Sequence, residues 1–158
     1  MIKMNKFKGL FTSVSVHWAT PMALYRTLDA EFNFNDDPCP LIPESDGLSR
    51  SWGDRTFCNP PYGKAIGLWL KKAYQESHQA KLVVCLIPSR TDTQWWHDYV
   101  MKAEEIRFIR GRLKFGGSQN SAPFPSAIVI FNKKGIIDAN RNGYNKVHTG
   151  CRDTDMER

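Results

Sequence analysis

The segment FCNPPYG, residues 57–63, carries the side chains best suited to chemistry in this sequence. Apolar residues run into Asn59, two prolines and an aromatic residue, which is typical of a buried strand that ends in a turn. Proline has no N–H to donate, so the carbonyl groups of such a turn stay free to accept hydrogen bonds. Oδ1 of Asn59 and the carbonyl of Pro60 can therefore bind the two hydrogens of one exocyclic amino group. Tyr62 adds a ring on which a planar base can stack, an interaction worth roughly 1–3 kcal/mol per base.

A rigid turn without a ligand is the competing interpretation of the same residues. The surroundings favour a ligand site, because a short apolar strand is predicted before Asn59 and a helix after it. In open α/β folds, ligands bind outside the carboxyl ends of the strands. We therefore expect residues 57–63 to lie at that edge of a sheet.

Three helices are predicted from apolar residues at helical spacing. The first begins at Pro21 with Thr20 as its N-cap, and the second has Ile66 on its apolar face. The third follows a capping box formed by Thr91 and Gln94.

Strands are predicted to alternate with these helices. Six segments have alternating or continuous apolar residues and are predicted to be strands: 31–36, 56–58, 82–87, 105–109, 112–115 and 126–131. The fold class is therefore α/β, a sheet covered by helices on both faces. The segments 112–115 and 126–131 are expected to form an antiparallel hairpin at one edge.

Taken in order, the motifs of the chain resemble those of the phage-type, Dam-like DNA N6-adenine methyltransferases, a family that depends on S-adenosyl-L-methionine. The resemblance covers about residues 17–132. It rests on HWATP (17–21), DPCP (37–40), DGLSRSW (46–52), FCNPPYG (57–63), LIPSRTDTQWWH (86–97), GRLKF (111–115) and SAPFPSAIVIF (121–131). It implies a Rossmann-like methyltransferase sheet.

The resemblance also implies roles for particular residues. The catalytic motif, NPPY, would receive an adenine flipped out of the duplex. Its residues are Asn59, Pro60, Pro61 and Tyr62. The residues that would line the S-adenosylmethionine site or contact its adenine are Thr20, Pro21, Asp37, Pro38 and Asp46. A methyl group on a sulfonium is already activated, so alignment of the acceptor nitrogen suffices. We accordingly expect no catalytic metal, no covalent enzyme intermediate and no essential cysteine.

Positive charge in this sequence favours a polyanionic partner, and the resemblance makes that partner DNA. The formal net charge is +6, and residues 61–120 carry ten basic but only five acidic side chains. Basic residues that follow predicted strands or the NPPY motif are the candidates for phosphate contact: Lys64, Arg90, Arg112 and Lys114. Solvated surface charges are the alternative for them. The loop 116–125 is expected to reach the groove and select the target.

Composition excludes several other classes. At 158 residues with 41% hydrophobic side chains, the chain suits one globular domain, which we expect over residues 16–133. Residues 1–15 are expected to be a flexible N-terminus and residues 134–158 a loose tail. The longest apolar run, 82–87, is too short to span a membrane. Four scattered cysteines lack metal-ligand spacing, so we expect free thiols and a cytoplasmic location, in a bacterial host if the chain is of phage origin.

The cofactor half is predicted to be trimmed. Only eight residues, PCPLIPES, separate Asp37 from Asp46, and a helical crossover between parallel strands needs about 10–12. We expect about five or six strands, with the cofactor's ribose held by residues 38–54, by the N-terminal segment, or across a homodimer interface.

Two other functions are compatible with these motifs. A catalytically silent DNA-binding module would keep the base pocket without productive cofactor binding, as the short cofactor region suggests. The NPPY geometry also permits methylation of another planar amino group, in RNA or in a glutamine side chain.

Overall fold

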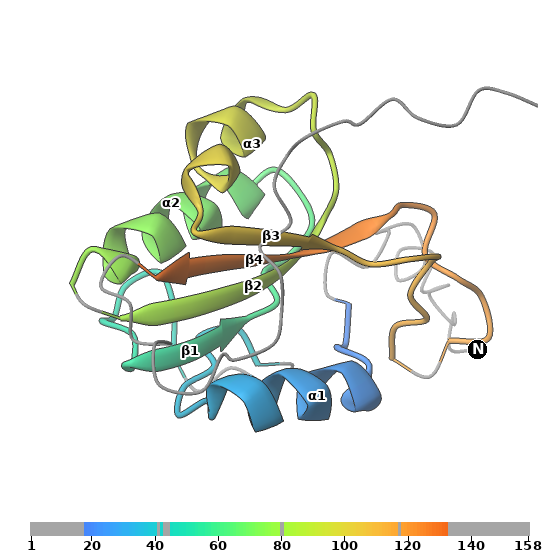
Figure 1. Cartoon of the computed structure of the whole chain (residues 1–158), viewed down its shortest axis with the longest axis horizontal. Helices are drawn as coiled ribbons and strands as arrows, with labels where there is room; N and C mark the ends of the chain where they lie inside the picture. Colours follow the sequence, from blue (N-terminus) through green and yellow to red (C-terminus); the bar gives the residue numbers. More distant parts are fainter. Residues whose placement is uncertain (1–17, 41, 43–44, 80, 117, 133–158) are drawn as a thin grey trace, which may run out of the picture.

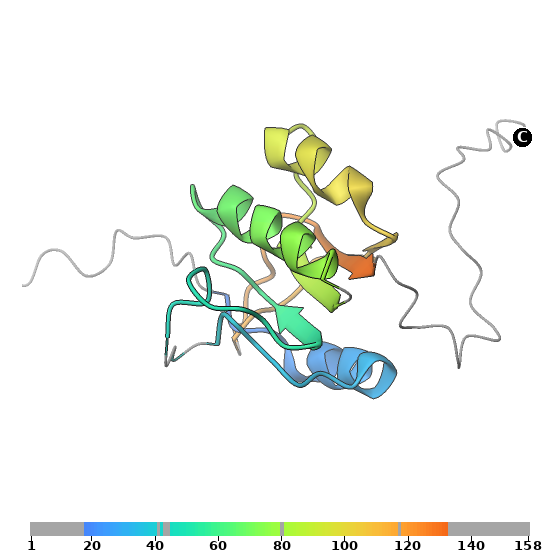
Figure 2. The same cartoon turned by 90° about the vertical axis from the view of Figure 1, so that its left-hand side faces the viewer.

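The computed structural model describes residues 18–40, 42, 45–79, 81–116 and 118–132 (Figures 1 and 2). The predicted flexible N-terminus, 1–15, and the predicted tail, 134–158, lie outside these residues. No helix in the described part of the chain is both long enough and apolar enough to cross a membrane.

The described residues form a mixed α/β fold around a sheet of four strands in the order β1-β2-β4-β3 (Figure 1). The strands are β1 (Arg55–Cys58), β2 (Leu82–Pro88), β3 (Glu105–Phe108) and β4 (Ser126–Asn132). β1 and β2 are parallel, with Cys58 opposite Cys85, while β4 is antiparallel to both β2 and β3. The carboxyl ends of β1 and β2 therefore meet at one edge of the sheet.

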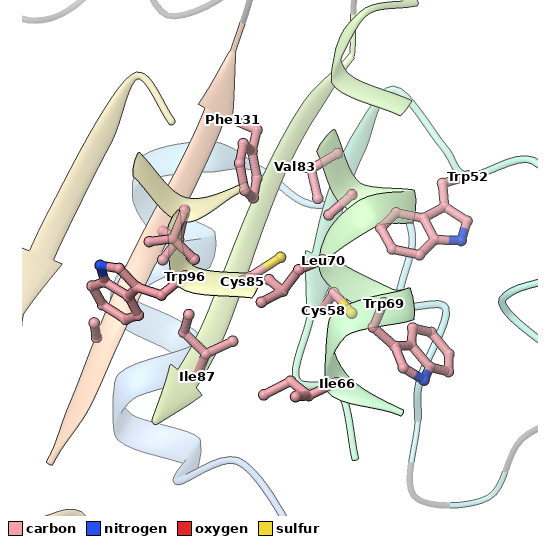
Figure 3. Packing of buried hydrophobic residues seen from close by; sticks show 14 residues of the cluster. Trp52, Cys58, Ile66, Trp69, Leu70, Val83, Cys85, Ile87, Trp96 and Phe131 are labelled. Atoms are coloured by element: carbon pink, nitrogen blue, oxygen red, sulfur yellow. The ribbon is translucent and has the colours of Figure 1, made fainter. Parts of the chain in front are cut away.

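Helices cover both faces of this sheet (Figure 2). They are α1 (Met22–Phe32), α2 (Ile66–Ser77), α3 (Gln94–Asp98) and the 3-10 helix η1 (Val100–Lys102). Alternate residues of β2 divide between two apolar clusters: Val83 and Cys85 pack with α2, α3 and η1, whereas Val84 and Leu86 pack with α1. Figure 3 shows the first cluster, with the side chains of α2 laid against β1 and β2. The predicted helical cover is confirmed.

One predicted strand, 31–36, is wrong. Helix α1 continues through Phe32, which is buried one turn beyond Leu28, and it ends at Asn33 in the left-handed conformation with φ 53°. Only Asp36 then forms an isolated parallel bridge, to Thr56. The alternation of apolar residues suggested a strand, but Phe32 is buried because it lies in the last turn of helix α1.

The predicted hairpin partner of 126–131 is also wrong, since residues 112–115 form no strand. Gly111 and Gly116, with φ of 80° and 56°, stand at either side of this segment and turn the chain. β4 pairs instead with β2 and β3. All seven of its residues are buried, as befits a central strand.

Both predicted helix caps need correction. Pro21 is the N-cap of α1, and no side chain caps that helix, so Thr20 is not its cap. Thr93 is the N-cap of α3 in place of Thr91, and its hydroxyl donates to the carbonyl of Arg90. The Thr20 hydroxyl bonds within the candidate site.

A buried ion pair fixes the opposite end of β2. Nζ of Lys81 lies 2.6 Å from Oε2 of Glu76 and also donates to Oγ of Ser51 and to the carbonyl of Trp52. Lys72 binds the other carboxylate oxygen of Glu76 at 2.8 Å. This cluster ties the end of α2 to the loop before β1.

We expect Lys81→Ala to lower the free energy of unfolding by about 2–4 kcal/mol, because it removes one partner of a buried charge and two further hydrogen bonds. Lys71→Ala, at an exposed position of α2, is the control and should change the free energy of unfolding by less than about 0.5 kcal/mol. Urea unfolding measures both. Equal effects from the two variants would contradict the role given to the buried cluster.

Candidate functional site

A cavity of about 290 Å³ lies beside the carboxyl end of β1. Its lining comes from the chain before and within α1, from residues 37–40, and from the end of β1. The residues that line it are Trp18, Ala19, Thr20, Met22, Tyr25, Asp37, Cys39, Pro40, Phe57 and Asn59. Three of the predicted site residues, Thr20, Asp37 and Asn59, thus meet at one cavity although they are far apart in the sequence.

The amide of Asn59 is held in one orientation. Its Nδ2 donates to the backbone carbonyl of Trp18 and, at 3.0 Å, to Oγ1 of Thr20. Its Oδ1 is buried and has no hydrogen-bond partner within the described part of the chain. An unpaired buried acceptor costs roughly 1–3 kcal/mol, so this oxygen is well suited to accept a hydrogen bond from a ligand.

The other residues of the NPPY motif are packed into the same edge. Pro60 is buried and Pro61 is half-buried. The hydroxyl of Tyr62 donates to the carbonyl of Leu86 at 3.0 Å, and burial raises its pKa well above the ordinary value. Its ring makes an edge contact with Phe124, with centroids 5.5 Å apart. The motif is therefore fixed to both β2 and the loop before β4.

Asp37 is the one acidic residue among the described residues that line the cavity. Its Oδ1 accepts a hydrogen bond of 2.9 Å from the N–H of Cys39, yet burial raises the pKa of its carboxyl group. Beside it, Pro38 is buried, and a Cβ at Gly47 would lie 2.1 Å from its carbonyl oxygen. Only glycine permits this approach, which closes the loop over Pro38.

Asp46 lies apart from the other predicted cofactor residues. It is exposed, does not line the cavity, and binds its own turn through the N–H of Leu48 and Oγ of Ser49, which lower its pKa. Pro21 also lies outside the lining, at the start of α1.

Several residues of the site were missed from the sequence. Asp36 binds the guanidinium of Arg50 through both carboxylate oxygens, at 2.8 and 2.9 Å, and accepts a third bond from the N–H of Gly53. This ion pair closes the loop that carries Asp37. No pattern in the sequence predicts it. Phe57 lies two residues before Asn59, which directly follows β1, so the alternation of an extended chain predicts that both side chains point to the same side.

Comparison with known proteins decides the family. The model of the family described as DNA N-6-adenine-methyltransferase (Dam) matches residues 10–146. The chain belongs to this family. The DNA N-6-adenine-methyltransferase of Haemophilus phage HP1 (strain HP1c1) is 27% identical over 151 residues, which cover 83% of this chain and 87% of the relative. No solved structure matches the chain. The resemblance inferred from the motifs is confirmed.

The Dam-family chain exposes its four predicted phosphate-binding residues. Lys64, Arg90, Arg112 and Lys114 are all exposed, and none forms an ion pair with the residues that the structure describes. Arg110, which the sequence reasoning did not single out, shares these properties. Lys64 follows the NPPY motif and Arg90 follows β2, so both come after the carboxyl ends of the two parallel strands, where Asn59 also lies.

The described residues contain no group of three or more His, Cys, Asp or Glu side chains arranged to hold a metal ion. Cys39, Cys58 and Cys85 have free thiols, and burial raises the pKa of Cys39 to about 11.

The raised pKa of Asp37 predicts a stability effect. Its ionised form is disfavoured in the fold, so its contribution to stability is greatest below its ordinary pKa of 3.8 and is lost as pH rises through the raised value. Asp37→Asn should therefore increase the melting temperature at pH 7, and this gain should shrink as pH falls below 4. Asp46→Asn is the control, since the lowered pKa of Asp46 predicts no gain at pH 7. Thermal unfolding between pH 3 and 7 measures both.

Proposed function

We propose that this chain transfers a methyl group from S-adenosylmethionine to N6 of adenine in DNA. Its membership in the DNA N-6-adenine-methyltransferase family supports this reaction. The observation that carries the proposal is the buried Oδ1 of Asn59, which lies beside a cavity and has no hydrogen-bond partner among the described residues. An exocyclic amino group is the donor that this acceptor lacks.

The side chains of the cavity fit a cationic ligand such as S-adenosylmethionine. Among the described residues, the lining has one carboxylate, that of Asp37, and no basic residue, while Trp18, Tyr25 and Phe57 supply aromatic rings. Both features favour positive charge on a ligand. Asp37 would contact the cofactor, and Pro21 and Pro38 would fix the segments that carry Thr20 and Asp37. When bound, S-adenosylmethionine supplies a methyl group on a sulfonium, already activated for transfer.

The protein's own contribution is to bind and activate the amino group. Oδ1 of Asn59 and the carbonyl of Pro60 would accept its two hydrogens, which turns the nitrogen lone pair out of conjugation with the ring. The same bonds stabilise the positive charge that develops on N6. Tyr62 would stack on the flipped base and offset part of the cost of unstacking it.

The exposed basic residues would hold the DNA backbone around this site. Lys64 and Arg90 follow the two parallel strands, while Arg112 and Lys114 lie in the chain between β3 and β4. Such contacts position the duplex without reading its sequence. Target selection would then fall to the loop 116–125.

The deciding experiment is mass spectrometry of nucleosides after incubation with S-adenosylmethionine and DNA or RNA. N6-methyladenine in DNA supports the proposal. Modified nucleosides in RNA alone would indicate the alternative substrate. A thermal shift with S-adenosylmethionine and no product in either would count against transfer, and DNA binding without that shift would indicate a silent binding module.

Asn59→Ala should lower the methylation rate by about 10²–10³-fold, because it removes an acceptor aimed at the reacting nitrogen. Binding of S-adenosylmethionine, measured by the shift in melting temperature, should persist. The control is Gln75→Ala, an exposed side-chain amide on α2 outside the cavity lining, which should keep the wild-type rate. Near wild-type turnover by Asn59→Ala would overturn the mechanism.

Arg112→Ala and Lys114→Ala should each weaken DNA binding and reduce the slope of log K against log salt by about 0.9, the value for one lost phosphate contact. Lys71→Ala changes charge equally on the exposed side of α2 and should leave the slope unchanged. Salt titrations of affinity for a short duplex measure all three. An equal change in all three slopes would show a general charge effect only.

A further inference from the structure

We propose that residues 18–20 form a brace, named here the 18–20 brace, that orients the amide of Asn59 for catalysis and links it to the chain between β3 and β4. Thr20 is its positioning residue. This inference rests on the proposed function, and it assigns the Thr20 hydroxyl to Asn59 in place of the cofactor.

The first step concerns the amide itself. Nδ2 of Asn59 carries two hydrogens, and it has two acceptors, the carbonyl of Trp18 and Oγ1 of Thr20. Rotating the amide by 180° would place Oδ1 against the Trp18 carbonyl, which repels it and has no hydrogen to donate. The brace therefore commits Oδ1 to the role of acceptor before any substrate arrives.

The second step concerns the other side of the brace. The N–H of Gly116 donates to the carbonyl of Ala19 at 2.9 Å. The indole of Trp18 packs against Phe115 and Phe124, with ring centroids 5.3 and 5.4 Å apart. The brace is thus held between Asn59 and the segment that carries Arg112 and Lys114.

The approach at Gly116 is close. Its φ is 56°, and a Cβ built there would lie 3.3 Å from Cβ of Ala19. Gly111 has a φ of 80°, but a Cβ there would meet nothing within 4 Å. The two glycines share the left-handed backbone and differ in contact with the brace. Movement of this segment on DNA would consequently be transmitted through Ala19 to the amide of Asn59.

The kinetic test compares Thr20→Val with Thr20→Ser in the full chain. Valine keeps the shape and removes the hydroxyl, so kcat should fall about fivefold, the effect of one lost hydrogen bond. The KM values for S-adenosylmethionine and DNA should stay within about twofold, and serine should restore most of kcat. A raised KM for S-adenosylmethionine at unchanged kcat would assign the hydroxyl to the cofactor and overturn the proposal. Unchanged kinetics would overturn it as well.

The link to the loop is tested by Gly116→Ala against Gly111→Ala. Both substitutions strain the backbone, but only the first meets the brace, so kcat should fall about fivefold in the first and stay within about twofold in the second. Equal losses in the two variants would remove the link.

A readout without turnover separates this proposal from the proposed function. The side-chain amide signals of Asn59 in ¹H–¹⁵N spectra are assigned by their loss in Asn59→Ala. They should shift in Thr20→Val and Gly116→Ala and stay in place in Gly111→Ala. If the wild-type chain fails to methylate DNA while these shifts appear, the methylation proposal fails and the brace stands. If the shifts are absent, the brace fails whatever the activity.

Discussion

The side-chain amide of Asn59 is the point on which the arrangement of this protein depends. Both its hydrogens are used within the chain, by Trp18 and Thr20, and its oxygen is buried with no partner among the residues that the structure describes. Such an amide must keep one orientation, because rotating it by 180° would place its oxygen against the carbonyl of Trp18. The surrounding structure supplies that rigidity. β1 fixes the backbone before Asn59, two prolines fix the backbone after it, and the hydroxyl of Tyr62 binds the end of β2.

The sheet explains how so small a set of elements can hold the site. β1 and β2 are its only parallel pair in the described residues, and their carboxyl ends meet at the edge where Asn59 and Arg90 lie. β2 is buried along all seven residues, with helices packed over both faces. At its other end, the ion pair between Lys81 and Glu76 fixes where the strand begins. Interactions at both ends of β2 therefore fix its register against β1. This register determines the position of Tyr62 relative to Leu86 along the strand direction.

Sequence reasoning located the parts of this structure that depend on local periodicity. The apolar residues of α2 recur at helical spacing, β2 is a continuous apolar run, and two prolines mark the turn after Cys58. Residue types alone therefore predict these three features. It failed at residues 31–36, where burial of Phe32 serves a helix, and at 112–115, where two glycines turn the chain. The Asp36–Arg50 pair and the contact of Trp18 with Asn59 join residues 14 and 41 positions apart. Contacts between residues so far apart produce no periodic pattern in the sequence.

The site has two energetically unfavourable features, and ligand binding would relieve both. The oxygen of Asn59 has no donor in the part of the chain that the structure describes, and the ionised form of Asp37 is disfavoured by burial. An amino group would satisfy the first, and a cation in the cavity would favour the second. Each binding event therefore removes a cost that the free protein carries, and ligand binding must stabilise the fold through these residues. By the same reasoning, Asp37→Asn can raise stability and still weaken the site, because burial disfavours the ionised carboxylate that a cationic ligand would require.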